Sequence, residues 1–340
     1  MLNNAVFVSF CVFAFGVHIH SSLLFAQHNP LNFIDEVAHY DEWKQEDWQV
    51  KVPGYVLHGT LSYLVCSELP TVVLFIAGSG PTDRDGNSRL INGKNNSFKM
   101  LAEELALAGI ASLRYDKRRI GASRPVRDDA NPIMFSDLVN DAVAWINSLK
   151  ASGQFSRIVV AGHSQGALVG KLAARETEID ALISFAGAGR PFGDLIREQY
   201  NRQLSYMPGG LALLDTLERY IGMITEGRRI EWVNPVFSPV FHPANQAFLS
   251  ENFLFDPVSE LSILDIPILI IQGSTDIQVS EMDAVLLAGA SPKTSYVLIN
   301  GMNHILKIAP LGDLESYGNP DLPVSDELVN ETIRFIKSLK

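Results

Sequence analysis

The fold is decided by residues 158–168, which read IVVAGHSQGAL. The first three residues are apolar and β-branched, which is typical of a buried strand. Residues 162–166, GHSQG, fit the pattern G-x-S-x-G, and the small and apolar residues after them predict a helix. A strand, a sharp turn and a helix in this order present the hydroxyl of Ser164 at the mouth of a sheet. The alternative interpretation is a serine that caps a helix between two loop glycines.

Strands and helices alternate on either side of this stretch. Amphipathic segments separate apolar segments that predict five further strands, at residues 71–76, 110–115, 181–187, 266–271 and 295–299. This alternation predicts a parallel sheet with helices on both faces. Ahead of it, residues 48–52 and 55–64 alternate apolar and polar side chains, which indicates an antiparallel hairpin at an edge of the sheet.

The alternation breaks at residues 190–260, which are rich in helix formers and aromatic residues and contain no clear buried strand. We interpret this segment as a helical cap inserted between the first part of the core, residues 27–189, and its second part, residues 261–340. Such a cap lies over the carboxyl edge of the sheet, above Ser164. Its Phe, Leu and Trp side chains either line an apolar acyl pocket or only form the core of the cap itself.

Residues 1–26 are typical of a signal peptide. The apolar run 5–17 is too short for a usual membrane span, and Ala26 supplies a small residue before a cleavage point. We therefore expect an exported protein, periplasmic or secreted, with no stable membrane insertion once the leader is removed. The lack of Lys and Arg ahead of the run leaves an uncleaved N-terminal anchor as the alternative.

Composition argues against several kinds of function. The 340 residues carry a formal net charge of -11, which disfavours nucleic acid and anionic membrane surfaces as partners. Only two cysteines occur, Cys11 and Cys66, so removal of the leader leaves no pair for a disulfide and no cysteine–histidine cluster for a metal. We expect no metal and no organic cofactor.

A serine hydroxyl becomes a strong nucleophile only beside a base that an acidic group orients. Asp276 follows one predicted strand and His304 follows the next, so both lie at the sheet edge that presents Ser164. The chain order Ser, Asp, His is the order that accompanies this kind of serine turn. We therefore predict that Ser164 is the nucleophile, His304 the general base and Asp276 the acid that orients it.

Three other residues compete for these roles. Asp265 and Asp283 lie near Asp276 in the sequence, and an aspartate after a strand is often only a helix cap or a turn former. His163 competes with His304, but it adjoins the serine on the turn and should point elsewhere.

With these residues the chain resembles the α/β-hydrolase superfamily, which implies a mostly parallel central sheet flanked by helices, with a helical cap. More narrowly, GSGPTDRDG at 78–86 and RYDKR at 114–118 resemble a bacterial esterase branch described as serine-aminopeptidase-like. That branch usually carries an acidic residue after the nucleophile and two glycines beyond it, and this chain departs at Gln165 and Ala167. It usually has glycine where this chain has Arg119, which leaves the conformation of that loop open.

An oxyanion hole needs two backbone donors aimed at the developing charge. One is the N–H of Gln165, the residue after the nucleophile. The other, by resemblance, is the N–H of Ser79, with that of Gly80 as its rival. The charged residues at 83–85 and 114–119 either bind a substrate group or pin these loops by ion pairs.

These observations predict a serine hydrolase that cleaves small-molecule carboxylic esters of short to medium acyl length through an acyl-enzyme. A peptidase or a thioesterase with the same three residues is the nearest alternative, because the acyl-transfer chemistry is shared. A non-catalytic binding protein of the cell envelope, built on the same scaffold, is the alternative of a different class.

Overall fold

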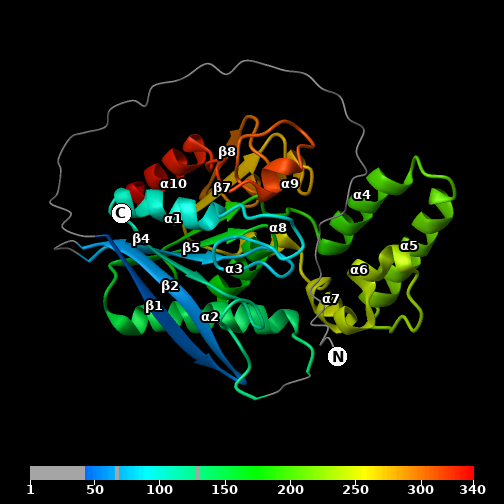
Figure 1. The fold of residues 1–340 in the computed structure, drawn as a ribbon, viewed down its shortest axis with the longest axis horizontal. Helices are drawn as coiled ribbons and strands as arrows, with labels where there is room; N and C mark the ends of the chain where they lie inside the picture. Colours follow the sequence, from blue (N-terminus) through cyan, green and yellow to red (C-terminus); the bar gives the residue numbers. More distant parts are fainter. Residues whose placement is uncertain (1–42, 66–68, 128–130) are drawn as a thin grey trace.

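The computed structural model describes residues 43–65, 69–127 and 131–340 of the chain. The predicted leader, residues 1–26, and both cysteines lie outside the described residues. Within them, eight strands form one sheet in the order β1-β2-β4-β3-β5-β6-β7-β8 (Figure 1). The strands are β1 (Trp43–Val52), β2 (Tyr55–Leu64), β3 (Thr71–Ile76), β4 (Ala111–Tyr115), β5 (Arg157–His163), β6 (Ala181–Phe185), β7 (Ile268–Gly273) and β8 (Thr294–Ile299).

The sheet is mostly parallel, as the alternation of elements predicts. β2 pairs antiparallel with β1 and with β4, and the other neighbouring strands run parallel. The hairpin begins at Trp43, earlier than the predicted residue 48, because residues 43–47 continue the backbone pairing with β2. β5, which leads into Ser164, lies between β3 and β6. The serine turn is therefore held by strands on both sides.

Helices cover both faces of this sheet (Figure 1). The flanking helices are α1 (Ser97–Leu107), α2 (Phe135–Ser152), α3 (Gln165–Glu176), α9 (Glu281–Ala288) and α10 (Asp326–Ser338). Along β5, Val159 enters the core that contains Leu101 of α1, and Val160 enters the core that contains Trp145 of α2. This alternation buries both faces of the strand, which explains why its sequence is continuously apolar. None of the helices among the described residues is long and apolar enough to cross a membrane.

Between β6 and β7 the chain leaves the sheet and forms a group of helices. The elements are α4 (Phe192–Leu204), α5 (Gly210–Thr225), η1 (Pro235–Phe237), α6 (Ser238–Phe241), η2 (Pro243–Asn245), α7 (Gln246–Asn252) and α8 (Pro257–Ser262). Of these, α4 to α7 stand to one side of the sheet, while Leu261 of α8 packs into the core that contains Trp145 (Figure 1). Phe237 and Phe241 are fully buried in a core that belongs to this segment, whereas Trp232 and Leu211 are exposed. The cap segment therefore uses many of its aromatic residues for its own packing.

Candidate active site

Ser164 lies at the tip of a strained turn between the end of β5 and the first residue of α3. Its backbone has φ 53° and ψ -122°, a combination that residues with a side chain rarely adopt. The N–H of Ser164 donates to the carbonyl oxygen of Phe185 at 2.9 Å, which ties the turn to the end of β6. The serine hydroxyl is thus presented at the carboxyl end of the sheet, where the sequence pattern predicts it.

The two glycines of the turn are required by close backbone contacts. A Cβ atom on Gly162 would lie 2.3 Å from the carbonyl oxygen of Gly166, and a Cβ atom on Gly166 would lie 2.2 Å from that of Ile76. Real carbon atoms do not approach this closely, so any other residue would push the helix away from the strands. The two glycines of the G-x-S-x-G pattern therefore allow α3 to pack closely against the strands.

His304 and Asp276 are brought together at the same end of the sheet. Asp276 lies after β7, His304 lies after β8, and the distance from His304 Nδ1 to Asp276 Oδ2 is 2.7 Å. Their side chains are 5% and 0% exposed. Because a carboxylate oxygen accepts, Nδ1 of His304 carries the donated proton and Nε2 is left with a free lone pair. This tautomer suits a general base.

Both oxygens of the Asp276 carboxylate are fully engaged. Backbone N–H groups of Gln278 and Val279 donate to Oδ1 at 2.7 and 3.0 Å. The side-chain amide of Gln272 donates to Oδ2 at 3.1 Å, beside the bond from His304. These contacts hold the carboxylate in one orientation and so fix the plane of the imidazole.

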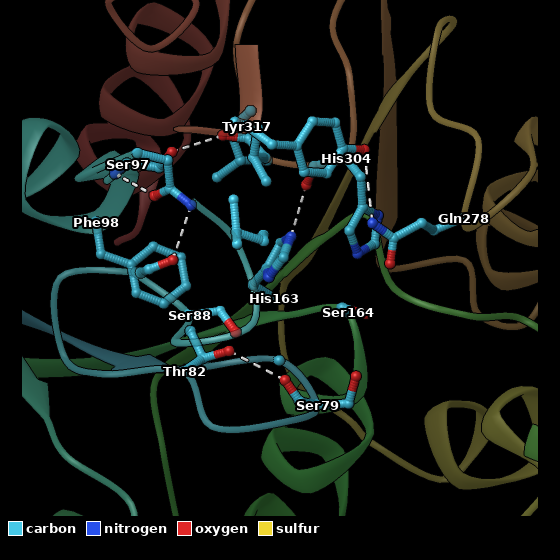
Figure 2. A pocket seen from close by; sticks show the side chains of 16 residues that line it. Ser79, Thr82, Ser88, Ser97, Phe98, His163, Ser164, Gln278, His304 and Tyr317 are labelled. Carbon is cyan, nitrogen blue, oxygen red and sulfur yellow. Dashed lines mark hydrogen bonds between the residues drawn. The ribbon is translucent and has the colours of Figure 1, made fainter. Parts of the chain in front are cut away.

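Ser164 and His304 line one pocket, which we call the loop pocket, between the loop after β3 and the loop after β8 (Figure 2). Its lining includes Gly78, Ser79, His163, Ser164, His304 and Tyr317. In the described part of the chain, the hydroxyl of Ser164 makes no hydrogen bond to His304. Without substrate such a bond is often long and forms only in the reacting complex.

The side chain of His163 hydrogen-bonds to the backbone of His304 and is not paired with Asp276. Its Nε2 donates to the carbonyl oxygen of His304 at 2.7 Å (Figure 2). Burial, together with the neighbouring imidazole of His304, lowers the pKa of His163 to about 3. The ring is therefore neutral at working pH, and it positions the loop that carries His304.

The two rival aspartates have other partners. Asp283 accepts hydrogen bonds from Nε and Nη2 of Arg190, at 2.9 and 2.6 Å, and from the hydroxyl of Ser280 at the start of α9. Asp265 pairs with Lys293 at 2.6 Å, and its side chain is 93% exposed. Neither of these aspartates is paired with His304.

The side chain of Lys117 supports the loop after β3, residues 77–96, by hydrogen bonds to its backbone. The buried ammonium group of Lys117 donates to the carbonyl oxygens of Gly78 and Gly80, the second at 2.8 Å. The hydroxyl of Thr82 donates to the carbonyl oxygen of Ser79 at 3.0 Å. Three successive carbonyl groups of this loop are therefore fixed by side chains.

Several other charged residues at 83–85 and 114–119 form ion pairs, either with one another or, in the case of Arg118, with Asp137 and Asp141 of α2. Arg84 binds Asp116 at 2.8 Å, and the buried guanidinium of Arg114 binds Asp85. Of the two interpretations of these charges, ion pairs that pin the loops are therefore what the structure contains. Arg119 adopts φ 66°, the left-handed conformation that the glycine of the related motif favours.

A second pocket lies on the cap side of Ser164, and we call it the cap pocket. Its lining includes Ser164, Gln165, Phe192, Gln199, Asn252 and Val279. None of the aromatic residues 220–255 that suggested an acyl pocket is among its described lining residues. Walls come instead from α3, the start of α4, the end of α7 and the loop after β7.

Three features of this site were not predicted from the sequence. They are the contact of Lys117 with the glycine loop, the support of Asp276 by Gln272, and the carboxamides of the cap pocket. The first had a signal, because Lys117 lies in a conspicuous charged run directly after a buried strand. The other two depend on side-chain directions that no local pattern encodes.

A strained serine turn in the middle of a mostly parallel sheet, with an Asp–His pair after the last two strands, defines the α/β-hydrolase fold. The chain therefore has the α/β-hydrolase fold. A model of the family described as "Serine aminopeptidase, S33" matches residues 91–213. The esterase EstD of Thermotoga maritima is 29% identical over 275 residues, which is 78% of this chain and 62% of EstD. The chain thus spans less than two thirds of the length of that relative.

Solved structures support the fold. A complex of ferulic acid with Est1E from Butyrivibrio proteoclasticus superposes with a TM-score of 0.57 at 17% identity, covering 86% of this chain and 98% of that one. The Pyrococcus furiosus esterase Pf2001 superposes with a TM-score of 0.55 at 15% identity, covering 92% and 97%. At these levels of sequence identity, the similarities concern the fold alone.

Proposed function

We propose that the protein is a serine hydrolase that cleaves small-molecule carboxylic esters through an acyl-enzyme. The observation that carries this proposal is the 2.7 Å contact between His304 and Asp276 at the rim of the pocket that contains Ser164. A nucleophile, a base and the acid that orients the base are the parts that acyl transfer needs. The esterase relatives favour the same chemistry.

The proposed reaction uses each residue in one role. Ser164 Oγ attacks the ester carbonyl while Nε2 of His304 takes its proton. The buried carboxylate of Asp276 stabilises the imidazolium that forms. His304 then protonates the departing alkoxide, and a water molecule, activated by the same imidazole, releases the acid and regenerates Ser164.

Two backbone donors are proposed to stabilise the oxyanion, the N–H groups of Gln165 and Ser79. Gln165 begins α3, where backbone N–H groups have no helical partner. In a trans peptide the carbonyl and the next N–H point in opposite directions, and the described chain contains no cis bonds. Because Lys117 holds the carbonyl of Gly78, the N–H of Ser79 must face away from Lys117. This geometry favours Ser79 over Gly80.

The linings of both pockets favour an esterase over an aminopeptidase. An aminopeptidase must bind the ammonium group of its substrate, which calls for a carboxylate near the nucleophile. Among the described residues, neither the loop pocket nor the cap pocket is lined by Asp or Glu. Gln165 stands where the related branch usually has an acidic residue. A peptidase remains the second candidate because of the matching family model.

The proposal includes short to medium acyl groups and an exported protein. The small size of the two pockets that border Ser164 supports the proposed acyl length. Export rests on the leader-like residues 1–26. N-terminal sequencing of protein from its native host is expected to start near Gln27, and a full-length cytoplasmic product would contradict export.

A substrate panel tests the proposed activity. We expect p-nitrophenyl acetate, butyrate and hexanoate to be hydrolysed at rates that Ser164→Ala reduces on the order of a thousandfold or more. Aminoacyl p-nitroanilides and an acyl thioester of the same chain length serve as comparisons. Faster turnover of the anilides would make the protein a peptidase, and faster turnover of the thioester a thioesterase. No Ser164-dependent turnover of any substrate would favour a binding protein.

A further inference from the structure

The cap pocket contains buried polar groups that no residue satisfies. Nε2 of Gln165, Oε1 of Gln199, and both Nδ2 and Oδ1 of Asn252 are buried without a hydrogen-bond partner among the described residues. All three side chains line the cap pocket, and they come from α3, α4 and α7. Asn252 is fully buried, and Gln199 is 9% exposed.

Such a cluster needs a physical reason. A buried donor or acceptor without a partner is costly, and folded proteins contain few of them. Here they converge on one cavity, which also borders Ser164. Its walls are otherwise apolar, with Leu168 and Phe192 among them. An unpaired cluster that faces the nucleophile is the arrangement expected of a site that a bound molecule completes.

The polar groups of this pocket specify an uncharged ligand. Three carboxamides offer donors and acceptors but no charge. Arg190 is the charged residue in the described lining, and it is already bound by Asp283 and Glu198. No free charge is therefore left for a carboxylate or an ammonium group. The cavity volume is about 30 Å³, which suits a group of a few atoms.

We propose that the cap pocket binds an uncharged hydrogen-bonding group of the substrate, of the hydroxyl or amide class, on one substituent of the ester. Asn252 supplies both a donor and an acceptor to this group, Gln165 a donor and Gln199 an acceptor. This inference rests on the proposed esterase function and narrows its substrate class to polar esters.

Matched pairs of substrates test the proposal on both sides of the ester bond. The acyl pair is p-nitrophenyl 3-hydroxybutyrate and p-nitrophenyl 3-methylbutanoate, in which a hydroxyl replaces a methyl of similar size. The alcohol pair is 2-hydroxyethyl acetate and propyl acetate. We expect kcat/KM to favour the hydroxylated member of at least one pair, by about tenfold or more, because the apolar partner leaves the carboxamides unpaired.

Asn252→Leu is the main variant. Because the amide of Asn252 has no partner in the described chain, its removal should leave the melting temperature unchanged or higher. The ratio of kcat/KM for the hydroxylated substrate to kcat/KM for its apolar partner should fall toward one. Gln203→Leu, one turn beyond Gln199 on α4 and outside the described pocket lining, is the control that should change neither quantity.

The outcomes separate this inference from the proposed function. A preference for the apolar member in both pairs, or a polar preference that survives Asn252→Leu, would overturn the inference while Ser164-dependent ester hydrolysis remains. A lower melting temperature in Asn252→Leu with an unchanged preference would show that the amide has only a structural role. If none of the four esters is hydrolysed, the result counts against the esterase function itself.

Discussion

The ammonium group of Lys117 is buried beneath the glycine loop and contacts two of its carbonyl oxygens. We predict that Lys117→Met lowers kcat on the order of tenfold to a hundredfold, because an oxyanion donor that is no longer held stabilises the transition state less. KM should change little, since the ground-state ester makes weaker use of this donor. Steady-state kinetics on a p-nitrophenyl ester measure both quantities.

Two further variants make this prediction specific. Lys117→Arg keeps a cationic donor and should recover part of kcat, whereas Lys94→Met, an exposed lysine on the same loop, should have no effect. An unchanged kcat in a folded Lys117→Met variant would contradict the positioning role. A rise in KM alone would instead assign Lys117 to substrate binding.

Lys171, in α3, is fully buried, and its Nζ has no hydrogen-bond partner among the described residues. Burial lowers the pKa of Lys171 to about 7 from its usual 10.5. Between pH 7 and pH 10.5 the unfolded chain binds more protons than the folded one, so the free energy of unfolding rises with pH across this range. Below pH 7 the lysine is charged in both states, and the folded protein bears the full cost of burying that charge. Replacement by an apolar side chain of similar length removes that penalty.

We therefore predict that Lys171→Met raises the free energy of unfolding at pH 7 by about 1–4 kcal/mol. The gain should shrink as pH rises toward 10. Urea unfolding at pH 7 and pH 9.5 tests this, with Lys99→Met, an exposed lysine of α1, as the control. A loss of stability in Lys171→Met at both pH values would mean that the ammonium group has a partner in solution.

At the scale of elements, Arg190 joins the start of the cap segment to α9. It binds Asp283, whose side chain is fully buried, and also Glu198 in α4. Burial raises the pKa of Asp283, but hydrogen bonds from Arg190 and Ser280 outweigh it and hold that pKa below its usual value. The stability from this pair is therefore present at neutral pH and is lost as pH falls through the folded pKa.

We predict that Asp283→Asn lowers the free energy of unfolding at pH 7 by about 1–3 kcal/mol, because the buried carboxylate loses its charge-assisted hydrogen bonds from Arg190, while Arg190 keeps its ion pair with Glu198. Hydrogen exchange should increase in α4. Its kcat should fall far less than that of Asp276→Asn, which removes the acid beside His304. The opposite order of the two kcat values would mean that Asp283, rather than Asp276, is the catalytic acid.

The elements themselves were largely predictable from the sequence. Buried parallel strands leave continuous apolar runs, so β3, β5 and β6 were found close to their true bounds. The way in which the cap segment uses its side chains was not predictable. Phe237 packs into the cap core and Asn252 faces the cap pocket, and neither direction follows from a helical pattern alone.

At the scale of the whole molecule, the sheet order brings residues far apart in the chain to one edge. Ser164, Asp276 and His304 could be predicted to meet there because parallel strands present their carboxyl ends together. The direction of each side chain could not be predicted in the same way. The contact of His163 with the carbonyl oxygen of His304, for example, depends on how two loops pack.

The central claim is that Ser164 is the nucleophile of a serine hydrolase, and covalent labelling tests it most directly. The full-length protein is treated with a fluorophosphonate, which captures an activated serine, and the modified peptide is identified by mass spectrometry. We predict one adduct, on Ser164, which is absent in Ser164→Ala, strongly slowed in His304→Ala and unchanged in Ser88→Ala, a serine in the loop pocket. No adduct on the folded wild-type protein, or an adduct on a serine other than Ser164, would contradict the account.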